Sequence, residues 1–275
     1  MVFLKKLIKF KKRYGLKLII SQVFYSLINK FNLLSPIDCI RTRINLDISE
    51  IFQNKVAYGI FKGMKLSNNI WWGKFDIATK LLGQYELHIL DKIIDLSDEF
   101  ETFIDIGAAD GYYAVGAVFS NLYSKSICFE ISEFGRQVIE ENSTINQVSD
   151  KIQIHGIANQ KLMSSVLEIE NKALILIDIE GGEFDLLTNE FLLVCKNSKL
   201  IIELHDSFIK GSDNRRNDLF KRANMYFDIT YLQRVNPDIY SFKELENFDD
   251  NFRQLVFSEG RPPKMEWVLF SPKYF

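Results

Sequence analysis

The chain has 275 residues, of which 25% are charged and 47% hydrophobic, enough to bury one large core or two modest ones. Its 13% aromatic content and five prolines exclude a disordered or collagen-like chain. No apolar run reaches the roughly 18 residues that a membrane-spanning helix needs. The three cysteines form no C-x-x-C pair, so we expect no disulfide framework and no thiolate zinc site. A reducing cytoplasmic compartment follows from this cysteine usage.

Charge is distributed unevenly along the chain. Residues 1–37 carry eight basic residues and no acidic one, although the whole protein has a net charge of -2. Lysines and apolar residues alternate in this arm at close to helical spacing, which predicts an amphipathic helix. Two interpretations remain open. Residues 1–20 lie on an anionic membrane surface, at the inner face, or the helix docks on the main domain or on a second subunit, as in a homodimer.

Residues 38–98 are expected to form an N-terminal cap. Alternating aromatic and polar residues predict a small hairpin before residue 75, and apolar residues at helical spacing predict a lead-in helix over 77–96.

Strands and helices then alternate through residues 99–275. Apolar strands are expected at 103–106, 126–130, 152–157, 173–178 and 200–204, with helices from 112, at 134–146, from 183 and at 214–223. Because these strands are largely apolar, they predict an α/β fold with a doubly wound, Rossmann-like, mostly parallel seven-stranded sheet covered on both faces. Two final strands, at 227–235 and 265–270, lack a crossover helix and are expected to form an antiparallel edge pair.

The segment 236–263 between these final strands is too long for a simple hairpin. It is predicted to be a lid over the same edge of the sheet, where Arg253 and Arg261 would be available for a phosphate or carboxylate. A dimer contact is the alternative.

The turn after the first strand reads Asp105-Ile106-Gly107-Ala108-Ala109-Asp110-Gly111. It matches neither a G-x-x-x-x-G-K-[ST] phosphate loop nor a G-x-G-x-x-G dinucleotide fingerprint, because Ala109 replaces the second glycine. Asp105 would repel a pyrophosphate and attract a cationic group, and Glu130, at the end of the second strand, can accept both hydroxyls of a ribose. These features predict a site for S-adenosylmethionine (SAM). A plain strand-to-helix turn, with Asp105 as a cap, is the alternative.

Five stretches of the chain together resemble the FkbM-like methyltransferases. They are G-Q-Y-E at 83–86, F-I-D-I-G-A-A-D-G-Y-Y-A at 103–114, C-F-E at 128–130, L-I-D-I-E-G-G-E-F-D-L-L at 176–187 and I-I-E-L-H-D at 201–206. This family comprises class I, SAM-dependent O-methyltransferases that often act on sugars. The resemblance covers residues 80–210 and, more weakly, the closing G-R-P-P-K-M-E-W-V-L-F-S-P.

The resemblance implies methylation of a sugar hydroxyl in a glycan, a sugar nucleotide or a lipid-linked saccharide, with no nucleic-acid partner. It also implies the residues of the cofactor site. They are Asp105, Gly107, Ala109 and Gly111 around the methionine part, Glu130 at the ribose, Ile157, Ala158 and Asn159 at the adenine, Tyr85 and Glu86 over the amino-acid end, and Asp178 beside the methyl group. Trp71 and Trp72 are candidates to stack on a sugar or to pack in the core.

Acidic residues gather where the later strands end, namely Asp178, Glu180, Glu183, Glu203 and Asp206, together with His205. A sugar hydroxyl is a weak acid, so its methylation needs a base or a metal ion. His205 titrates near neutrality and is the first candidate for the base, with Asp178 and Glu180 as competitors. A divalent cation such as Mg²⁺, held by Asp178 with Glu203 or Asp206, is the other solution. Glu183 and Glu203 are alternatively a helix cap and a partner of backbone amides.

Two further classes of function remain open. The first is a nicotinamide-dependent oxidoreductase on the same kind of sheet, which Ala109 and Asp105 argue against. The second is a non-catalytic module that binds SAM or a partner through a degenerate site, which the acidic edge and His205 argue against. No G-x-S-x-G motif is present, so hydrolase chemistry has no support.

Overall fold

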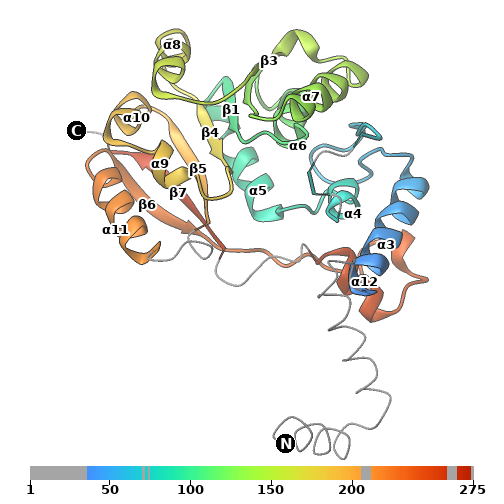
Figure 1. Ribbon diagram of the computed structural model, residues 1–275. Helices are drawn as coiled ribbons and strands as arrows, with labels where there is room; N and C mark the ends of the chain where they lie inside the picture. Colours follow the sequence, from blue (N-terminus) through green and yellow to red (C-terminus); the bar gives the residue numbers. More distant parts are fainter. Residues whose placement is uncertain (1–35, 70–71, 74, 206–211, 259–264, 274–275) are drawn as a thin grey trace, which may run out of the picture.

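A seven-stranded sheet forms the centre of the protein (Figure 1). The computed structural model describes residues 36–69, 72–73, 75–205, 212–258 and 265–273, with side chains at 212 and 213 omitted. The strands are β1 (Thr102–Ile106), β2 (Lys125–Phe129), β3 (Ile152–His155), β4 (Leu174–Ile177), β5 (Lys199–Leu204), β6 (Phe227–Leu232) and β7 (Glu266–Pro272).

The strand order is β3-β2-β1-β4-β5-β7-β6, and β7 runs antiparallel to both of its neighbours while the remaining pairs are parallel. The predicted doubly wound, mostly parallel sheet is thus confirmed, with its antiparallel strand one place in from the edge.

The described helices cover the two faces of the sheet or belong to the N-terminal part and to the segment after β6. They are α3 (Pro36–Phe52), α4 (Ile77–Leu81), α5 (Leu87–Asp95), α6 (Tyr112–Phe119), α7 (Glu133–Ile145), α8 (Gln160–Glu170), α9 (Glu183–Leu186), α10 (Asn189–Val194), α11 (Ser212–Ala223) and α12 (Asp250–Val256), with short 3-10 turns η1 (Ser97–Glu99), η2 (Ser149–Lys151) and η4 (Lys243–Leu245). Figure 1 shows α5, α6 and α7 on one side of the strands and α8 to α11 on the other.

The apolar sequence of β4 reflects this two-sided cover. Leu174 and Leu176 pack into the core shared with α5 and α6, whereas Ile175 and Ile177 pack into the core beneath α8 to α11. Successive strand residues point to opposite faces, so a strand buried on both sides has no polar position. Because β1, β2 and β4 are parallel, their carboxyl ends meet at one edge of the sheet.

The N-terminal part differs from the expectation in two places. The lead-in helix predicted over 77–96 is broken between α4 and α5, because Gly83 has a φ of 63° and a Cβ there would lie 2.2 Å from the Tyr58 carbonyl oxygen. This turn also sets Glu86 in the left-handed region, with a φ of 45°. The expected hairpin before residue 75 is reduced to one isolated bridge, between Lys55 and Lys65.

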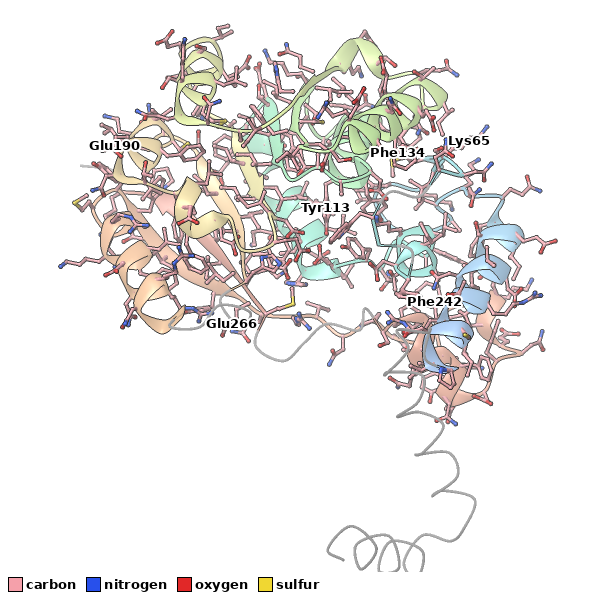
Figure 2. All side chains as sticks on the ribbon, viewed as in Figure 1. Lys65, Tyr113, Phe134, Glu190, Phe242 and Glu266 are labelled. Atoms are coloured by element: carbon pink, nitrogen blue, oxygen red, sulfur yellow. The ribbon has the colours of Figure 1, made fainter. Side chains whose placement is uncertain are left out.

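The segment that follows β6 packs against the N-terminal part of the chain. In Figure 1, α12 lies beside α3, and Phe242, labelled in Figure 2, is buried with its ring against Tyr58. Arg253 donates to the carbonyl oxygens of Phe248 and Glu246 and covers the Tyr240 ring. The expectation that Arg253 is available for an anion was therefore wrong, because its guanidinium holds its own segment together.

Several predicted features lie outside the described residues. They are most of the basic arm over 1–37, and Trp71, Asp206 and Arg261. No helix among the described residues combines the length and the apolarity needed to cross a bilayer.

Two glycines give a matched test of packing. A Cβ at Gly116, on α6, would lie 2.4 Å from the Phe61 ring, whereas a Cβ at Gly156 meets nothing within 4 Å. We expect Gly116→Ala to lower the free energy of unfolding by about 1–3 kcal/mol, because overpacking forces ring and backbone apart. Gly156→Ala should leave it within about 0.5 kcal/mol of wild type. Urea unfolding measures both, and equal values for the two variants would contradict the packing at Phe61.

Candidate active site

A cavity of about 730 Å³ opens at the carboxyl ends of β1, β2, β3 and β4. This is the edge at which open α/β sheets bind ligands, and the volume is in the range of small-molecule sites. We call it the first cavity. Its lining includes Trp72, Ile106, Gly107, Ala109, Phe129, Glu130, Ile131, Gly156, Ile157, Ala158, Asn159, Gln160, Asp178, Ile179, Glu180, Gly182, Asp185, Leu186 and Thr188.

The loop after β1 passes against the end of β4. Gly107 has a φ of 91°, and a Cβ there would lie 1.8 Å from the Asp178 carbonyl oxygen, so only glycine fits. The N–H groups of Gly107 and Ala108 both donate to the Phe129 carbonyl oxygen, at 2.8 and 3.1 Å. These contacts join the ends of β1, β2 and β4 into one rigid wall of the cavity.

Glu130 is fixed on this wall by two backbone N–H groups. Ala109 donates to Oε2 at 2.9 Å and Ser132 donates to Oε1 at 2.7 Å. Glu130 is buried apart from its part in the cavity lining. Each carboxylate oxygen keeps a further lone pair, so the side chain can accept from two neighbouring hydroxyls.

Ile157, Ala158 and Asn159 lie together on the next part of the wall, after β3. The Asn159 side chain accepts from the Leu162 N–H at 3.0 Å and so begins α8, which fixes the loop before it. Trp72 also lines the cavity, although much of its ring is exposed. Ile157, Ala158 and Trp72 make this part of the lining largely apolar.

Four of the predicted cofactor residues do not line this cavity. Gly111 begins α6, and Tyr85 packs its ring against Tyr112 and Tyr113. Glu86 is buried, accepts from the Tyr113 hydroxyl and lines a different cavity. Tyr113 is labelled in Figure 2.

Asp105 is the fourth, and it lies buried beneath the loop. Burial, with the nearby charges of Asp110 and Glu130, raises the pKa of Asp105 to about 8, although the Ala114 N–H opposes this. Its Oδ2 has no hydrogen-bond partner among the described residues.

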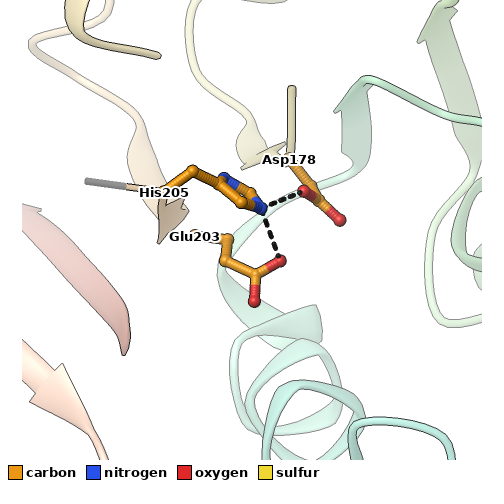
Figure 3. A group of neighbouring side chains, drawn as sticks. All are labelled: Asp178, Glu203 and His205. Atoms are coloured by element: carbon orange, nitrogen blue, oxygen red, sulfur yellow. Dashed lines mark ion pairs between the residues drawn. The ribbon is translucent and has the colours of Figure 1, made fainter. Parts of the chain in front are cut away.

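Four carboxylates surround His205 just beyond β5 (Figure 3 shows two of them). Glu183 accepts from the His205 backbone N–H at 2.7 Å and lies 3.1 Å from Nδ1. Nε2 lies 3.4 Å from Glu203, 3.5 Å from Glu180 and 3.6 Å from Asp178. We call these five residues the His205 cluster. Asp178 and Glu180 also line the first cavity, so the cluster reaches the ligand space on one side.

The cluster needs a positive charge. Burial would lower the pKa of His205, but its hydrogen bonds to Glu183 and Glu203, with the charge of Asp178, outweigh burial and raise it to about 11. Burial and the charges of Glu203 and Glu86 raise the pKa of Asp178 well above its usual value, against the influence of His205. At neutral pH His205 therefore carries a proton, which makes it a poor acceptor of another.

A divalent cation fits the same cluster. Asp178, Glu203 and His205 each offer one ligand atom, and these atoms lie within 4.8 Å of one another. Ligands at right angles around Mg²⁺ or Ca²⁺ lie roughly 3.0–3.5 Å apart, close to the separations at Nε2. Of the metal ligands predicted from sequence, Asp178 and Glu203 are brought together, and Asp206 lies outside the described residues.

Sequence reasoning named Glu183 only as one of the acids at this edge or as a helix cap, and it missed Asp185. Glu183 is completely buried, and besides His205 it accepts from the Gly181 N–H at 2.9 Å. It thereby holds the turn after β4 to the end of β5, a role that its separation of 22 residues from His205 conceals. Asp185 adds a further carboxylate to the first cavity, and only its place on the same short helix as Glu183 could have indicated it.

Comparison with known proteins finds similar solved structures, whereas no protein-family model and no curated protein matches the chain. The chain is similar to the O-methyltransferase from Bacillus cereus in complex with SAH, at 12% identity over 91% of this chain and 96% of that one, with a TM-score of 0.44. It is also similar to a geranyl diphosphate methyltransferase in complex with GPP and sinefungin, at 8% identity over 83% and 93%, with a TM-score of 0.45.

A third neighbour is the Bacillus subtilis m1A22 tRNA methyltransferase TrmK, at 12% identity over 66% of this chain and 64% of that one, with a TM-score of 0.40. Identities and TM-scores are low for all three, so any function has to be argued from the residues of this chain.

The raised pKa of Asp105 gives a prediction about stability. The folded protein keeps the Asp105 proton up to about pH 8, whereas the unfolded chain releases it near pH 4. The stabilisation that protonated Asp105 gives the folded state is therefore complete below about pH 4. It is lost as the pH rises from there through 8, at about 1.4 kcal/mol per pH unit. Asp105→Asn should remove this loss, so its free energy of unfolding should gain on wild type between pH 5 and pH 8.

Urea unfolding at pH 5, 6.5 and 8 measures the difference. Asp98→Asn is the control, because Asp98 is exposed and makes no hydrogen bond or ion pair with any described residue. A gap between Asp105→Asn and wild type that stays constant with pH would contradict the burial of a protonated Asp105.

Proposed function

We propose that this protein is an S-adenosylmethionine-dependent O-methyltransferase. The observation that carries the proposal is the charge of the first cavity, whose described lining contains Glu130, Asp178, Glu180 and Asp185 and no lysine or arginine. Such a cavity attracts a cationic ligand. SAM carries a sulfonium and an ammonium group together with a ribose, and Glu130 stands at the end of β2, where a carboxylate accepts from ribose hydroxyls.

The same charges oppose a nicotinamide dinucleotide. Its pyrophosphate would have to lie on the loop at Gly107, close to the carboxylates of Asp178 and Glu180. Dinucleotide sites instead place the pyrophosphate at a helix N-terminus that such carboxylates do not face. The oxidoreductase alternative therefore has no support from the cavity.

Methyl transfer to a hydroxyl is an in-line displacement. The acceptor oxygen forms a bond to the methyl carbon while the carbon–sulfur bond breaks, and its electron pair stays on sulfur to give neutral S-adenosylhomocysteine. The hydroxyl proton leaves to a base. No electrons are exchanged with another reagent, so the protein has only to align three atoms and take up one proton.

Asp178 is the residue placed to accept that proton. It belongs both to the lining of the first cavity and to the His205 cluster, and its side chain is 25% exposed while those of His205 and Glu203 are buried. His205 and Glu183 hold Asp178 and Glu180 in place from behind. In this proposal His205 is a positioning residue, and Asp178 is the base.

We further propose a sugar hydroxyl as the acceptor, in a glycan, a sugar nucleotide or a lipid-linked saccharide. Support comes from the resemblance of the chain to the FkbM-like methyltransferases and from Trp72, which offers an aromatic face at the cavity. A lipid-linked acceptor would also give the basic residues of 1–37 a function, at an anionic membrane surface.

The alternative to a base at this cluster is a divalent cation held by Asp178, Glu203 and His205, in which case Asp178 is a ligand and not the base. The cation would replace the proton of His205 and, as a Lewis acid, lower the pKa of an acceptor hydroxyl.

Cofactor binding is tested by a pair of glutamates. Glu130→Ala removes the carboxylate proposed for the ribose, whereas Glu133→Ala changes an exposed residue of α7 nearby in sequence. We expect Glu130→Ala to weaken SAM binding by about tenfold or more, which corresponds to about 1.4 kcal/mol, and Glu133→Ala to leave it unchanged. Calorimetric titration measures both. Equal affinities for SAM in wild type and Glu130→Ala would remove Glu130 from the site.

Metal binding is tested without turnover. We expect Mn²⁺ to raise the melting temperature of the wild type, because an ion that binds only the folded state stabilises it. Glu203→Gln should abolish this rise, and Glu168→Gln, an exposed residue of α8, should retain it. A wild type that is indifferent to Mn²⁺, or a Glu203→Gln variant that responds fully, speaks against a metal at this cluster.

A further inference from the structure

A second cavity, of about 300 Å³, is present apart from the first one. It is formed by the start of α5, the segment after β6 and the end of α12. Its lining consists of Gln84, Glu86, Leu87, His88, Arg234, Val235, Asn236, Pro237, Phe257 and Ser258. None of these residues lines the first cavity. The volume is at the lower end for small-molecule sites, so it suits one sugar-sized group rather than a long chain.

One packing contact links the second cavity to the cluster. His88 packs its ring against Trp267 at 6.4 Å, and Trp267 stands opposite Glu203 in the β5–β7 pairing. The cluster thus borders the first cavity through Asp178 and Glu180 and is linked to the second through Glu203, Trp267 and His88.

Arg234 gives the second cavity its chemistry. It is the only lysine or arginine among the described lining residues, it is exposed, and it makes no hydrogen bond or ion pair with any described residue. Other arginines nearby are already engaged, because Arg41 donates to Ser258 and Arg253 donates to Phe248. An unengaged guanidinium in a concave site is suited to bidentate binding of a carboxylate or phosphate.

The lining contains one acidic and one basic residue. Glu86 is buried, whereas Arg234 is exposed. Gln84 and Asn236 add amide groups to the lining. A ligand that carries hydroxyl groups at one end and an anion at the other matches this arrangement, whereas a wholly apolar or cationic acceptor does not.

We propose that the second cavity is the acceptor subsite, and that Arg234 binds an anionic group on the acceptor, a phosphate or a carboxylate. The acceptor hydroxyl then points towards Asp178, opposite the methyl group of a cofactor in the first cavity. The role of the second cavity as an acceptor subsite rests on the proposed function, because it assumes methyl transfer from the first cavity. The anion site at Arg234 does not depend on that function and is tested independently. It narrows the acceptor from any sugar to a sugar that bears a negative charge.

The test uses inorganic phosphate and glucuronate as probes, with methyl glucoside as the neutral comparison. Each is titrated by calorimetry at millimolar concentration into the full-length protein, with and without saturating S-adenosylhomocysteine. The variants are Arg234→Ala and, as the matched control, Arg43→Ala, an exposed arginine of α3 that does not line the cavity and pairs with Asp47. Both should keep the wild-type melting temperature, because neither side chain is packed in the core.

We expect at least one anion to bind the wild type and Arg43→Ala alike, and Arg234→Ala to weaken that binding by about tenfold. Tighter binding of phosphate would assign a phosphorylated acceptor, and tighter binding of glucuronate an acidic sugar. The proposal is overturned if neither anion binds, if Arg234→Ala binds as the wild type does, or if Arg43→Ala loses binding equally. A failure of S-adenosylhomocysteine to bind the wild type would count against the proposed function instead, and the anion titration without cofactor would still decide the role of Arg234.

Discussion

Negative charge gathered around one buried imidazole is the constraint on which the rest of this structure depends. The end of β4, the turn after it, α9 and β5 each bring one carboxylate to His205. Buried carboxylates cost several kcal/mol each unless a positive charge neutralises them. The proton on His205 supplies one such charge, and a divalent cation or the sulfonium of a cofactor would supply another. Asp178 and Glu180 of this arrangement also contribute to the acidic lining of the first cavity.

The sheet could be predicted from the sequence because strands that are buried on both faces consist mainly of apolar residues. Strands such as β4 contain no polar residue, and the helices between them supply the alternation. What escaped prediction depends on contacts between distant segments. Gly83 interrupts the predicted helix because its φ is 63°, and the nearby Tyr58 carbonyl group leaves no room for a Cβ there, which no periodicity in the helix itself reports. The segment after β6 likewise uses Arg253 internally, which its sequence does not indicate.

The residues of the site fall into the same two groups, namely those that the sequence indicates and those that only the fold brings together. Gly107 and Glu130 carry local signals, a glycine in a strand-to-helix turn and an acid at the end of the next strand, and the structure brings both to the first cavity. Tyr85, Glu86 and Asp105 were expected there as well, but the broken helix and the loop direct them elsewhere. The contact between Glu183 and His205, and the second cavity with Arg234, join elements far apart in the sequence. Only the folded arrangement brings them together.

The most direct test of the central claim is calorimetric titration of the wild-type protein with SAM and, separately, with NAD⁺. The charge of the first cavity predicts binding of SAM in the micromolar range and none of NAD⁺ at the same concentrations, because one ligand brings a sulfonium and the other a pyrophosphate. Binding of NAD⁺ without SAM would contradict the interpretation of the first cavity, with its carboxylates of Glu130, Asp178, Glu180 and Asp185, as a cation site. It would also contradict the proposed methyl transfer.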